Sequence, residues 1–459
     1  MENYNWPCPP GLTPFAHQKE TAAFLAGKPK AFCFNEQGTG KTASVIWATD
    51  YLMKLKVLKR VLIVCPLSIM HSAWQQDLFK FAVHRRVDVA YGSAAKRKEI
   101  LNAGAEYVVI NFDGVQICKN EIIRGGFDLV VVDEASAYKN AQTTRWKTMR
   151  DIMKHVKGLW MLTGTPAAQS PEDAYGLAKL VSPSNVPSFF GQYRDMVMTP
   201  ITQYRWIPRP EAKAIVHKAL QPAIRFEKRE CIDLPEITYL DRAAPMTPQQ
   251  SKYYARLKTE MLMEAAGEEV TAVNAAVKIN KLLQIACGSV YSDSKEVVDF
   301  DASNRLQVVK EVIDEASNKV LVFVPFTHTI KKVCDYLTQH KITCDVINGD
   351  VPVARRAEII KRFQTEANPS VLVIQPQAAS HGLTLTAADT IIWYAPVTSV
   401  ETYLQANARI DRPGQKNAMT VVHIMGSPIE GRVYSLLRGK IDDHQQIIDL
   451  YKQEIDGAS

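Results

Sequence analysis

The sequence predicts an α/β protein with two tandem lobes, each containing a parallel sheet covered by helices. Short apolar runs recur along the chain, they are continuous rather than alternating, and longer amphipathic segments separate them. Continuous apolar strands are typical of parallel sheets buried on both faces, and the spacers have room for crossover helices. At 459 residues the chain is also too long for one ordinary core, since domains average roughly 150 residues.

The expected strands fall into two groups. In the first half they are residues 31–34, 60–66, 107–112, 127–134 and 158–164. In the second half they are residues 319–326, 344–349, 370–376, 389–396 and 419–425. Residues from about 166 to 240, rich in Pro, Arg and aromatic side chains, indicate a helical insertion in the first lobe. Residues 247–290 are helical by composition. We therefore expect a first lobe over residues 1–240 and a second over residues 241–459.

The composition argues against several classes of protein. The 55 basic and 48 acidic residues give a formal charge of +7, which permits an anionic partner without requiring one. The eight cysteines form no C-x-x-C pair and no Cys/His cluster at zinc spacing, so we expect neither a structural metal nor a disulfide framework. The first residues lack a signal-peptide pattern, and no apolar run approaches the ~20 residues that span a bilayer. We expect a soluble intracellular protein.

The segment FNEQGTGKTAS follows an apolar run and precedes a helical stretch, which is the context of a phosphate-binding loop. Gly38 and Gly40 allow backbone N–H groups to approach a phosphate. Lys41 can reach the terminal phosphates of a nucleotide, and the Thr42 hydroxyl can ligate Mg²⁺. Asn35 replaces the first glycine of the strict G-x-x-x-x-G-K-[ST] pattern, which leaves an ordinary turn as the alternative.

The segment DLVVVDEAS places Asp133 and Glu134 at the end of an expected strand. A carboxylate there is costly to bury unless it meets a cation, so Asp133 fits beside a Mg²⁺ ion held by Thr42. Glu134 can then polarise the attacking water. An acidic pair after a strand is also a common helix N-cap, but the upstream phosphate loop favours the catalytic interpretation.

The segment MLTGTPAAQS places small and hydroxylated residues after another strand. Alone it indicates an ordinary turn. At the carboxyl edge of a sheet that also carries the phosphate loop, where α/β proteins bind ligands, it is interpreted as a relay between nucleotide and polymer.

The segment QANARIDRPGQK sets Arg409 and Arg412 three residues apart, which on a helix puts both on one face. Pro413 disfavours helical geometry at the residue before it, so we expect the helix to end at Arg412. Two guanidinium groups aimed together suit a polyanion. The alternative is a solvated helix end, where the macrodipole favours basic residues. The clusters KRK (96–98) and RR (355–356) are interpreted as solvated faces.

The order of these motifs resembles that of the superfamily-two helicases, and specifically of the Swi/Snf-type ATPases. The resemblance runs from about residue 12 to residue 440, and its most specific pieces are LTLTAADTIIWYAP, QANARIDRPGQK and LPEITYLDRAAPMTPQQSKYY. It implies two RecA-like lobes that face one another, with ATP and Mg²⁺ in the cleft and arginines of the second lobe completing the site. It also implies double-stranded DNA as the partner of a monomeric motor.

The resemblance implies roles for individual residues at matching positions. The catalytic residues would be Lys41, Asp133, Glu134, Arg409 and Arg412. The nucleotide would contact Gln18, the match to the family's adenine-reading glutamine, together with Gln37, Gly38, Thr39, Gly40, Lys41, Thr42 and Gly382. Mg²⁺ would be held by Thr42 and Asp133. Coupling would use Thr163, Gly164, Thr165 and Gln405. The nucleic acid would contact Pro66, Leu67, His71, Trp74, Asn111, Thr165, Asn348, Gly349, Ser380 and Thr386. From the sequence alone, His71 and Trp74 could equally belong to the core or to the surface.

The chain departs from the family pattern at two positions. Ser136 stands where most relatives carry His, a change that bears on coupling between nucleotide and nucleic acid, and His381 stands where the family usually has Gly. No accessory domain of a chromatin remodeller is recognised, which by analogy suggests a compact bacterial or phage protein.

Three functions remain open at this point. The leading hypothesis is an ATP-driven motor that tracks along double-stranded DNA. A strand-separating helicase on DNA or RNA is the alternative within enzymes. A nucleotide-switched DNA clamp that recruits a partner is the alternative outside them, although Glu134 argues against it because a clamp has no use for a hydrolytic glutamate.

Overall fold

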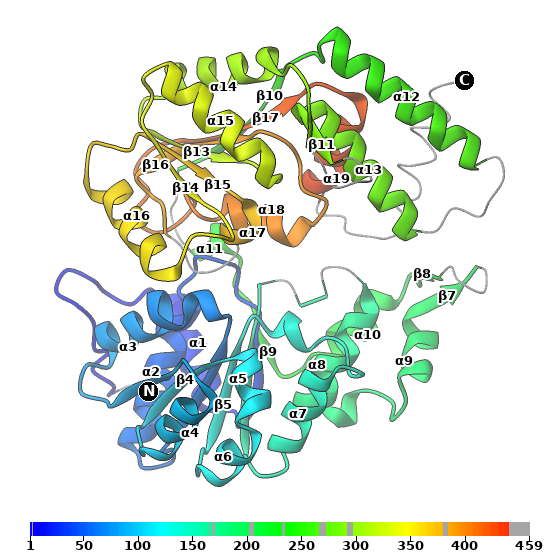
Figure 1. Ribbon diagram of the computed structural model, residues 1–459. Coiled ribbons are helices and arrows are strands. Elements are labelled where there is room, and N and C mark those ends of the chain that lie inside the picture. Colours follow the sequence, from blue (N-terminus) through cyan, green and yellow to red (C-terminus); the bar gives the residue numbers. More distant parts are fainter. Residues whose placement is uncertain are drawn as a thin grey trace. The chain divides into compact units, whose positions relative to one another are not determined.

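The computed structural model describes residues 1, 3–164, 166–167, 170–201, 206–231, 235–265, 272–291, 297–379 and 384–439. The chain divides into two compact units, Met1–Asp233 and Leu234–Ser459 (Figure 1). Each unit is built around its own parallel sheet. Within the described ranges, no helix has both the length and the apolar character needed to cross a bilayer.

Among the described residues, the sheet of the first unit has the strand order β3-β4-β2-β5-β6-β1-β9, and its neighbouring strands all run parallel. The strands are β1 (Lys30–Cys33), β2 (Val61–Cys65), β3 (Val87–Ala90), β4 (Tyr107–Asn111), β5 (Leu129–Asp133), β6 (Gly158–Leu162) and β9 (Ala223–Ile224). Strands β2, β4 and β6 are buried along their whole length. Their continuous apolar sequences are explained by this burial on both faces.

Helices cover both faces of this sheet. One face is packed by α1 (Ala16–Ala26), α2 (Lys41–Lys54) and α3 (Gln76–Phe81). The other face is packed by α4 (Ala94–Asn102), α5 (Phe112–Ile117), α6 (Lys119–Arg124), α7 (Thr144–Ile152) and α8 (Ala174–Val181).

The expected insertion is mainly helical, as predicted. It contains α8, α9 (Phe190–Val197), α10 (Ala212–Ala219) and α11 (Lys228–Cys231), with short 3₁₀ turns at Pro171–Asp173 and Pro183–Asn185. It also contains two features that the sequence did not predict. Strands β7 (Met198–Pro200) and β8 (Trp206–Pro208) pair antiparallel, and β9 adds to the edge of the main sheet beside β1.

Over the described ranges, the sheet of the second unit has the order β10-β17-β16-β13-β15-β14, and its neighbouring strands also run parallel. The strands are β10 (Ile237–Ala243), β13 (Lys319–Phe323), β14 (Cys344–Ile347), β15 (Val371–Ile374), β16 (Ala388–Trp393) and β17 (Met419–Met425). A separate antiparallel pair joins β11 (Ser289–Tyr291) and β12 (Val297–Asp299).

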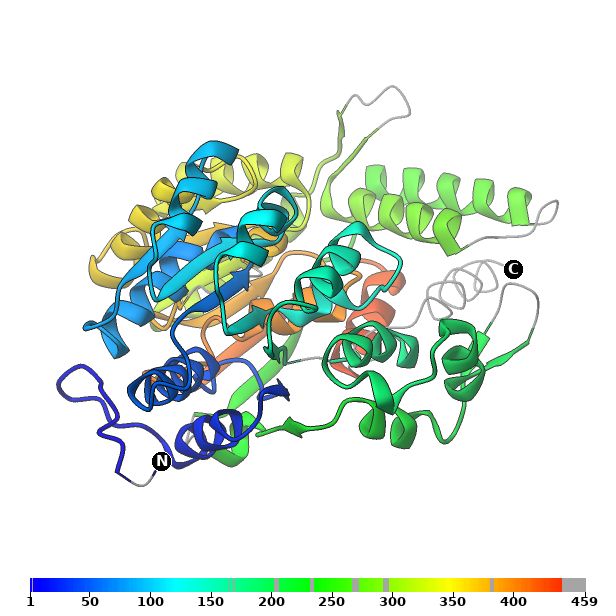
Figure 2. The same cartoon turned by 90° about the horizontal axis from the view of Figure 1, so that it is seen from below.

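Helices again cover both faces. One face is packed by α14 (Ser303–Glu315) and α15 (Thr327–Gln339). The other is packed by α13 (Ala272–Cys287), α16 (Val353–Thr365), α18 (Val400–Asn407) and α19 (Pro428–Arg438). The short helix α17 (Pro376–Ala379) follows β15. Helix α12 (Pro248–Ala265) lies beside α13, and the two form a helical pair (Figure 2).

The predicted fold class, two α/β units with parallel sheets, is confirmed, and each of the ten expected strands corresponds to a strand of the structure. Strands β3, β7, β8, β9, β10, β11 and β12 were not predicted. Strand β10 is mostly exposed along its length, so its sequence lacks a buried apolar run. The expected lobe boundary after residue 240 falls inside β10, which pairs along its length with β17 of the second unit.

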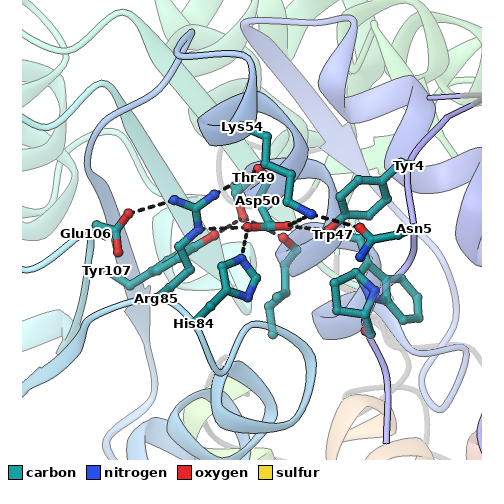
Figure 3. Close-up of polar contacts among 12 residues, drawn as sticks. Tyr4, Asn5, Trp47, Thr49, Asp50, Lys54, His84, Arg85, Glu106 and Tyr107 are labelled. Carbon is teal, nitrogen blue, oxygen red and sulfur yellow. Dashed lines mark hydrogen bonds and ion pairs between the residues drawn. The ribbon is translucent and has the colours of Figure 1, made fainter.

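The N-terminal segment packs onto α2 through a buried carboxylate. Figure 3 shows Tyr4, His84 and Arg85 converging on Asp50. The Tyr4 hydroxyl donates to Asp50 Oδ2 at 2.6 Å, Arg85 Nε donates to Oδ1 at 2.7 Å, and His84 Nε2 lies 2.8 Å from Oδ1. Burial opposes ionisation of Asp50, but the hydrogen bonds from these three side chains outweigh it and hold its pKa below the ordinary value. This network anchors the helix that begins at Lys41.

Candidate active site

The loop between β1 and α2 has the backbone that phosphate binding requires. Gly38 and Gly40 adopt φ angles of 83° and 82°, in the left-handed region that favours glycine. Helix α2 begins at Lys41 with Gly40 as its N-cap, so N–H groups at a helix N-terminus face the loop. Lys41 Nζ donates to the carbonyl oxygens of Asn35 at 2.8 Å and Glu36 at 3.2 Å. The lysine ammonium therefore lies within the curve of the loop.

Asn35, the departure from the strict glycine pattern, has a structural explanation. Its side chain is buried, with Nδ2 donating to Thr21 Oγ1 at 2.8 Å and Oδ1 accepting from the Phe226 N–H at 3.0 Å. Its backbone lies outside the positive-φ region, so this position does not require glycine. Asn35 thus ties the phosphate loop to α1 on one side and to the chain after β9 on the other.

Gln18, expected to read adenine, is buried against the phosphate loop. Its Nε2 donates to the Thr39 carbonyl at 3.1 Å, and its Oε1 accepts from the Phe15 N–H at 3.0 Å. A Cβ atom on Gly40 would lie 2.2 Å from Gln18 Nε2, so this approach also requires glycine. Gln18 therefore braces the loop, and its contact with adenine stays a prediction.

Asp133 lies at the same edge of the sheet as the loop. In the strand register, Asp133 is paired with Leu162 of β6, and Leu162 is paired with Cys33 of β1. The three adjacent strands β5, β6 and β1 therefore end at the same edge. Asp133 Oδ2 accepts from Trp74 Nε1 at 2.9 Å, and Oδ1 accepts from the Glu134 N–H at 3.0 Å. Burial raises the pKa of Asp133 above its ordinary value, although the Lys41 ammonium and both hydrogen bonds act in the opposite direction.

Glu134 adopts a left-handed backbone, with φ of 55° and ψ of 61°, immediately before the 3₁₀ turn Ala135–Tyr138. For a non-glycine residue this conformation costs on the order of 1–3 kcal/mol, and such strain is concentrated at functional sites. The left-handed turn directs the chain away from the sheet directly after Asp133. Glu134 is the N-cap residue of this 3₁₀ turn, and its role in catalysis stays a prediction.

The third motif lies against the phosphate loop. The Thr163 N–H donates to the Cys33 carbonyl at 3.1 Å, and a Cβ atom on Gly164 would lie 3.5 Å from Gln37 Cγ. Gln37 Oε1 is buried and has no hydrogen-bond partner within the described ranges. Thr165, the third residue expected in this motif, lies outside the described residues.

These groups fit a nucleoside triphosphate with Mg²⁺. Within the described residues, the N–H groups of Gly38 and Gly40 have no backbone acceptor, and those of Lys41 and Thr42 lie in the first turn of α2, where no intrahelical acceptor is within reach. These four N–H groups are available to phosphate oxygens. The Thr42 hydroxyl and the Asp133 carboxylate are hard oxygen ligands of the kind that Mg²⁺ prefers.

The arginine motif of the second unit corrects one prediction. Helix α18 ends at Asn407 and not at Arg412, so both arginines follow the helix. The Arg409 carbonyl accepts from the Leu385 N–H at 3.0 Å, which draws the chain out of the helix before the proline is reached. The Arg409 side chain is buried, whereas Arg412 is half-buried and donates from Nη1 to Thr384 Oγ1 at 3.0 Å. The two guanidinium groups therefore do not share one helix face.

Other predicted residues of the second unit are less informative. Gln405 is buried on α18, where its Nε2 donates to Glu401 Oε1 at 3.1 Å. The motif segment around Ser380, His381 and Gly382 lies outside the described residues.

Three of the residues expected at the nucleic-acid surface of the first unit, Pro66, Trp74 and Asn111, are buried instead. Trp74 is fully buried, and Asn111 is buried with its Oδ1 accepting from Arg97 Nη1 at 2.9 Å. Leu67 and His71 are exposed, as surface contacts require, while Pro66 is buried at the end of β2. Trp74 packs inward because its indole is held by the core and by Asp133.

In the second unit, Asn348 and Gly349 form the loop after β14, where Gly349 is exposed. Arg356 Nη2 donates to the carbonyls of Asn348 at 2.9 Å and Gly349 at 3.3 Å. Arg356 therefore braces this loop, and Arg97 braces Asn111, although both were assigned to solvated faces. No local sequence signal distinguishes these two arginines from solvated basic residues, because only the fold brings them to their partners. Thr386 is half-buried before β16.

Comparison with known families adds an independent observation. The model of the SNF2-related domain matches residues 17–291, more than half of the chain, and the model of the helicase conserved C-terminal domain matches residues 304–414. The chain belongs to the SNF2-related family. Within this SNF2-related chain, the first match includes the phosphate loop and Asp133, and the second includes both arginines.

Named relatives of this SNF2-related chain are longer proteins. The uncharacterized ATP-dependent helicase MG018 of Mycoplasma genitalium is 28% identical over 410 residues, covering 87% of this chain and 38% of the relative. Chromodomain-helicase-DNA-binding protein 1-like of Danio rerio is 25% identical over 432 residues, covering 89% and 41%. The chain therefore spans less than half the length of these relatives. The Sulfolobus solfataricus SWI2/SNF2 ATPase core in complex with dsDNA is 21% identical, with a TM-score of 0.47, covering 96% of this chain and 92% of that one.

Proposed function

We propose that this chain is an ATP-dependent motor that hydrolyses ATP to move along double-stranded DNA. The observation that carries the proposal is the arrangement of the phosphate loop, Asp133 and Glu134 at one edge of the first sheet. Family membership and the names of the relatives, ATP-dependent helicase and helicase-DNA-binding protein, support ATP use and a DNA partner. The choice of duplex DNA rests on the resemblance of the motif set to Swi/Snf-type ATPases. A DNA partner implies a location inside a cell.

The residues of the first unit divide the chemistry among them. Loop N–H groups and Lys41 would hold the phosphates, and Thr42 and Asp133 would hold Mg²⁺, which when bound neutralises phosphate charge. Glu134 would orient the attacking water and accept its proton. Gln18 and Gly164 would support the phosphate loop through their contacts with Thr39 and Gln37.

We propose that the second unit contributes Arg409 and Arg412 to hydrolysis, as the arginines of such motors stabilise charge on the transferred phosphoryl group. The two units would then correspond to the ATP-binding lobe and the second helicase lobe. The dependence of hydrolysis on both units would link chemistry to movement.

A strand-separating helicase is the second candidate, and one observation favours it. Phe189 is 72% exposed and Phe190 is 37% exposed in the helical insertion. Exposed aromatic rings are the kind of group that can wedge apart a base pair. Duplex tracking remains the first candidate because it requires only backbone contacts.

Steady-state ATPase rates with no polymer, single-stranded DNA, duplex DNA and RNA test the proposal. We expect duplex DNA to stimulate hydrolysis most, with little dependence on sequence and a steep loss of binding with salt, at a log-log slope near −0.9 per neutralised phosphate. Stimulation by RNA alone would overturn both DNA candidates.

A further inference from the structure

The segment after β2 has one exposed side and one buried side. It consists of a 3₁₀ turn, Leu67–Ile69, followed directly by a π-helical turn, Met70–Gln75, and then by α3. Leu67 is 43% exposed and His71 is exposed, whereas Trp74 is fully buried. A π-helical turn is rare and is frequently found at functional sites. The same short segment therefore faces both the solvent and the core.

The buried side of the segment reaches the candidate Mg²⁺ ligand. Trp74 Nε1 donates to Asp133 Oδ2 at 2.9 Å, while the Glu134 N–H occupies Oδ1 at 3.0 Å. A hydrogen bond to a charged acceptor is stronger than one between neutral groups, and an indole N–H can only donate. With one donor on each oxygen, the rotation of the carboxylate about its Cβ–Cγ bond is fixed.

Trp74 is itself held rigidly. It belongs to the apolar core that α1, α2 and α3 form against the sheet, together with Val131 of β5 and Leu162 of β6. Close-packed interiors transmit displacement rather than absorb it. A shift of the 67–75 segment must therefore either carry the indole with it or break its bond to Asp133, and both change how Asp133 is oriented.

We propose that Trp74 is a positioning residue that connects the surface around Leu67 and His71 to the Asp133 carboxylate. A polymer bound at that surface would set the orientation in which Asp133 holds Mg²⁺, so polymer binding would regulate the nucleotide site. The proposal concerns the regulation of the site described above and rests on the proposed function. It assigns to Trp74 a role in coupling, in place of the direct nucleic-acid contact expected from the sequence.

The variant Trp74→Phe tests the link, because phenylalanine keeps an aromatic ring in the core and removes the indole donor. Trp160→Phe is the matched control. Trp160 is also fully buried in the first unit, and its Nε1 donates at 2.8 Å to the Lys28 carbonyl, before β1 and away from Asp133. Both variants lose one indole hydrogen bond. A difference between them therefore reports the loss of the bond to Asp133 in particular, and not the loss of an indole N–H in general.

The first measurement is equilibrium binding of a fluorescent, non-hydrolysable ATP analogue to the full chain, with Mg²⁺ and with EDTA. The ratio of the two affinities reports the Mg²⁺ site and does not depend on turnover. Loss of a residue that orients a metal ligand typically costs 10- to 100-fold in metal affinity. We expect the ratio to fall about 10-fold in Trp74→Phe and to stay at the wild-type value in Trp160→Phe. An unchanged ratio in Trp74→Phe would overturn the link to Asp133.

The second measurement adds duplex DNA to the same assay. Because coupling between sites is reciprocal, duplex DNA should raise the Mg²⁺-dependent affinity ratio severalfold in the wild type and in Trp160→Phe, but not in Trp74→Phe. If Trp74→Phe does not fold, the coupling is tested with the wild type alone. An affinity ratio, with Mg²⁺ over with EDTA, that duplex DNA leaves unchanged would reject the coupling. Failure of duplex DNA to stimulate wild-type ATPase would reject the proposed function separately, because the DNA-free ratio still tests Trp74 and Asp133.

Discussion

Replacing Asp50 with asparagine should destabilise the first unit without touching the nucleotide site. The Asp50 side chain has no exposed surface and accepts hydrogen bonds from Tyr4, Arg85 and His84 at 2.6 to 2.8 Å (Figure 3). Removing one member of a buried ion pair costs about 3–5 kcal/mol. Arg85 is 14% exposed and keeps a second partner, Glu106, at 2.8 Å, which lowers the cost. We expect Asp50→Asn to reduce the free energy of unfolding by about 2–4 kcal/mol.

Urea denaturation followed by tryptophan fluorescence measures this change. Of the seven tryptophans in the chain, all except Trp393 belong to the first unit, so the signal reports that unit. With a slope of about 3 kcal/mol/M, the midpoint should fall by roughly 1 M. Tyr4→Phe, which removes one donor, should cost about 1–2 kcal/mol. Asp113→Asn is the control, because Asp113 pairs with Arg145 at a 73% exposed position and should contribute less than about 1 kcal/mol.

The pH dependence follows from the same network. The pKa of Asp50 is held below its ordinary value in the folded chain. The stabilisation that Asp50 contributes is therefore fully present above its unfolded-state pKa of about 4, and it is lost as the pH falls through its folded-state pKa. The difference between wild type and Asp50→Asn should therefore be complete at pH 7 and shrink below about pH 4. If Asp50→Asn shifts the midpoint no more than Asp113→Asn does, the network does not anchor α2.

The remaining predictions concern the nucleotide site. Glu134→Gln should bind a fluorescent ATP analogue normally and hydrolyse ATP hardly at all, whereas Lys41→Ala should lose binding as well, because Lys41 contacts ground-state phosphates. Arg412→Ala should lower kcat by ~10³ or more with little loss of stability, and Arg412→Lys should not restore it, since a point charge cannot replace the planar guanidinium. Asn35→Gly, which restores the strict motif, should lower the free energy of unfolding by about 1–3 kcal/mol in urea denaturation, because the bonds to Thr21 and Phe226 are lost.

Specific outcomes would contradict these expectations. Near-normal turnover in Glu134→Gln would remove its assignment to the attacking water. Full activity in Arg412→Lys, or unfolding of Arg412→Ala, would show that Arg412 is only a structural charge. A gain of stability in Asn35→Gly would show that the position prefers the glycine of the strict pattern.

Much of the fold was predictable because buried parallel strands have a distinctive sequence. The expected strands are continuous apolar runs, and burial on both faces explains them directly. Strand β10 was missed for the same reason, since it is mostly exposed and has no such run. The end of α18 was misplaced by several residues because a tertiary hydrogen bond from Leu385 ends the helix before Pro413 can act.

The site was predictable only where its chemistry is local in sequence. The phosphate loop and Asp133 are contiguous motifs, so residue type and spacing identify them. The resemblance implied a nucleic-acid contact for Trp74 and left core and surface equally open, whereas the structure shows its indole bonded to Asp133, 59 positions away, which no local pattern reveals. The Asp50 network joins residues separated by 34 to 46 positions, and it was likewise invisible before the fold was known.

We propose above all that the chain moves along duplex DNA without separating its strands. One preparation should be assayed for ATP-dependent displacement of a triplex-forming strand, which reports duplex tracking, and for separation of a forked duplex. We expect triplex displacement by the wild type, its loss in Glu134→Gln, and no fork separation in either. Robust fork separation without triplex displacement would contradict duplex tracking and favour the strand-separating helicase.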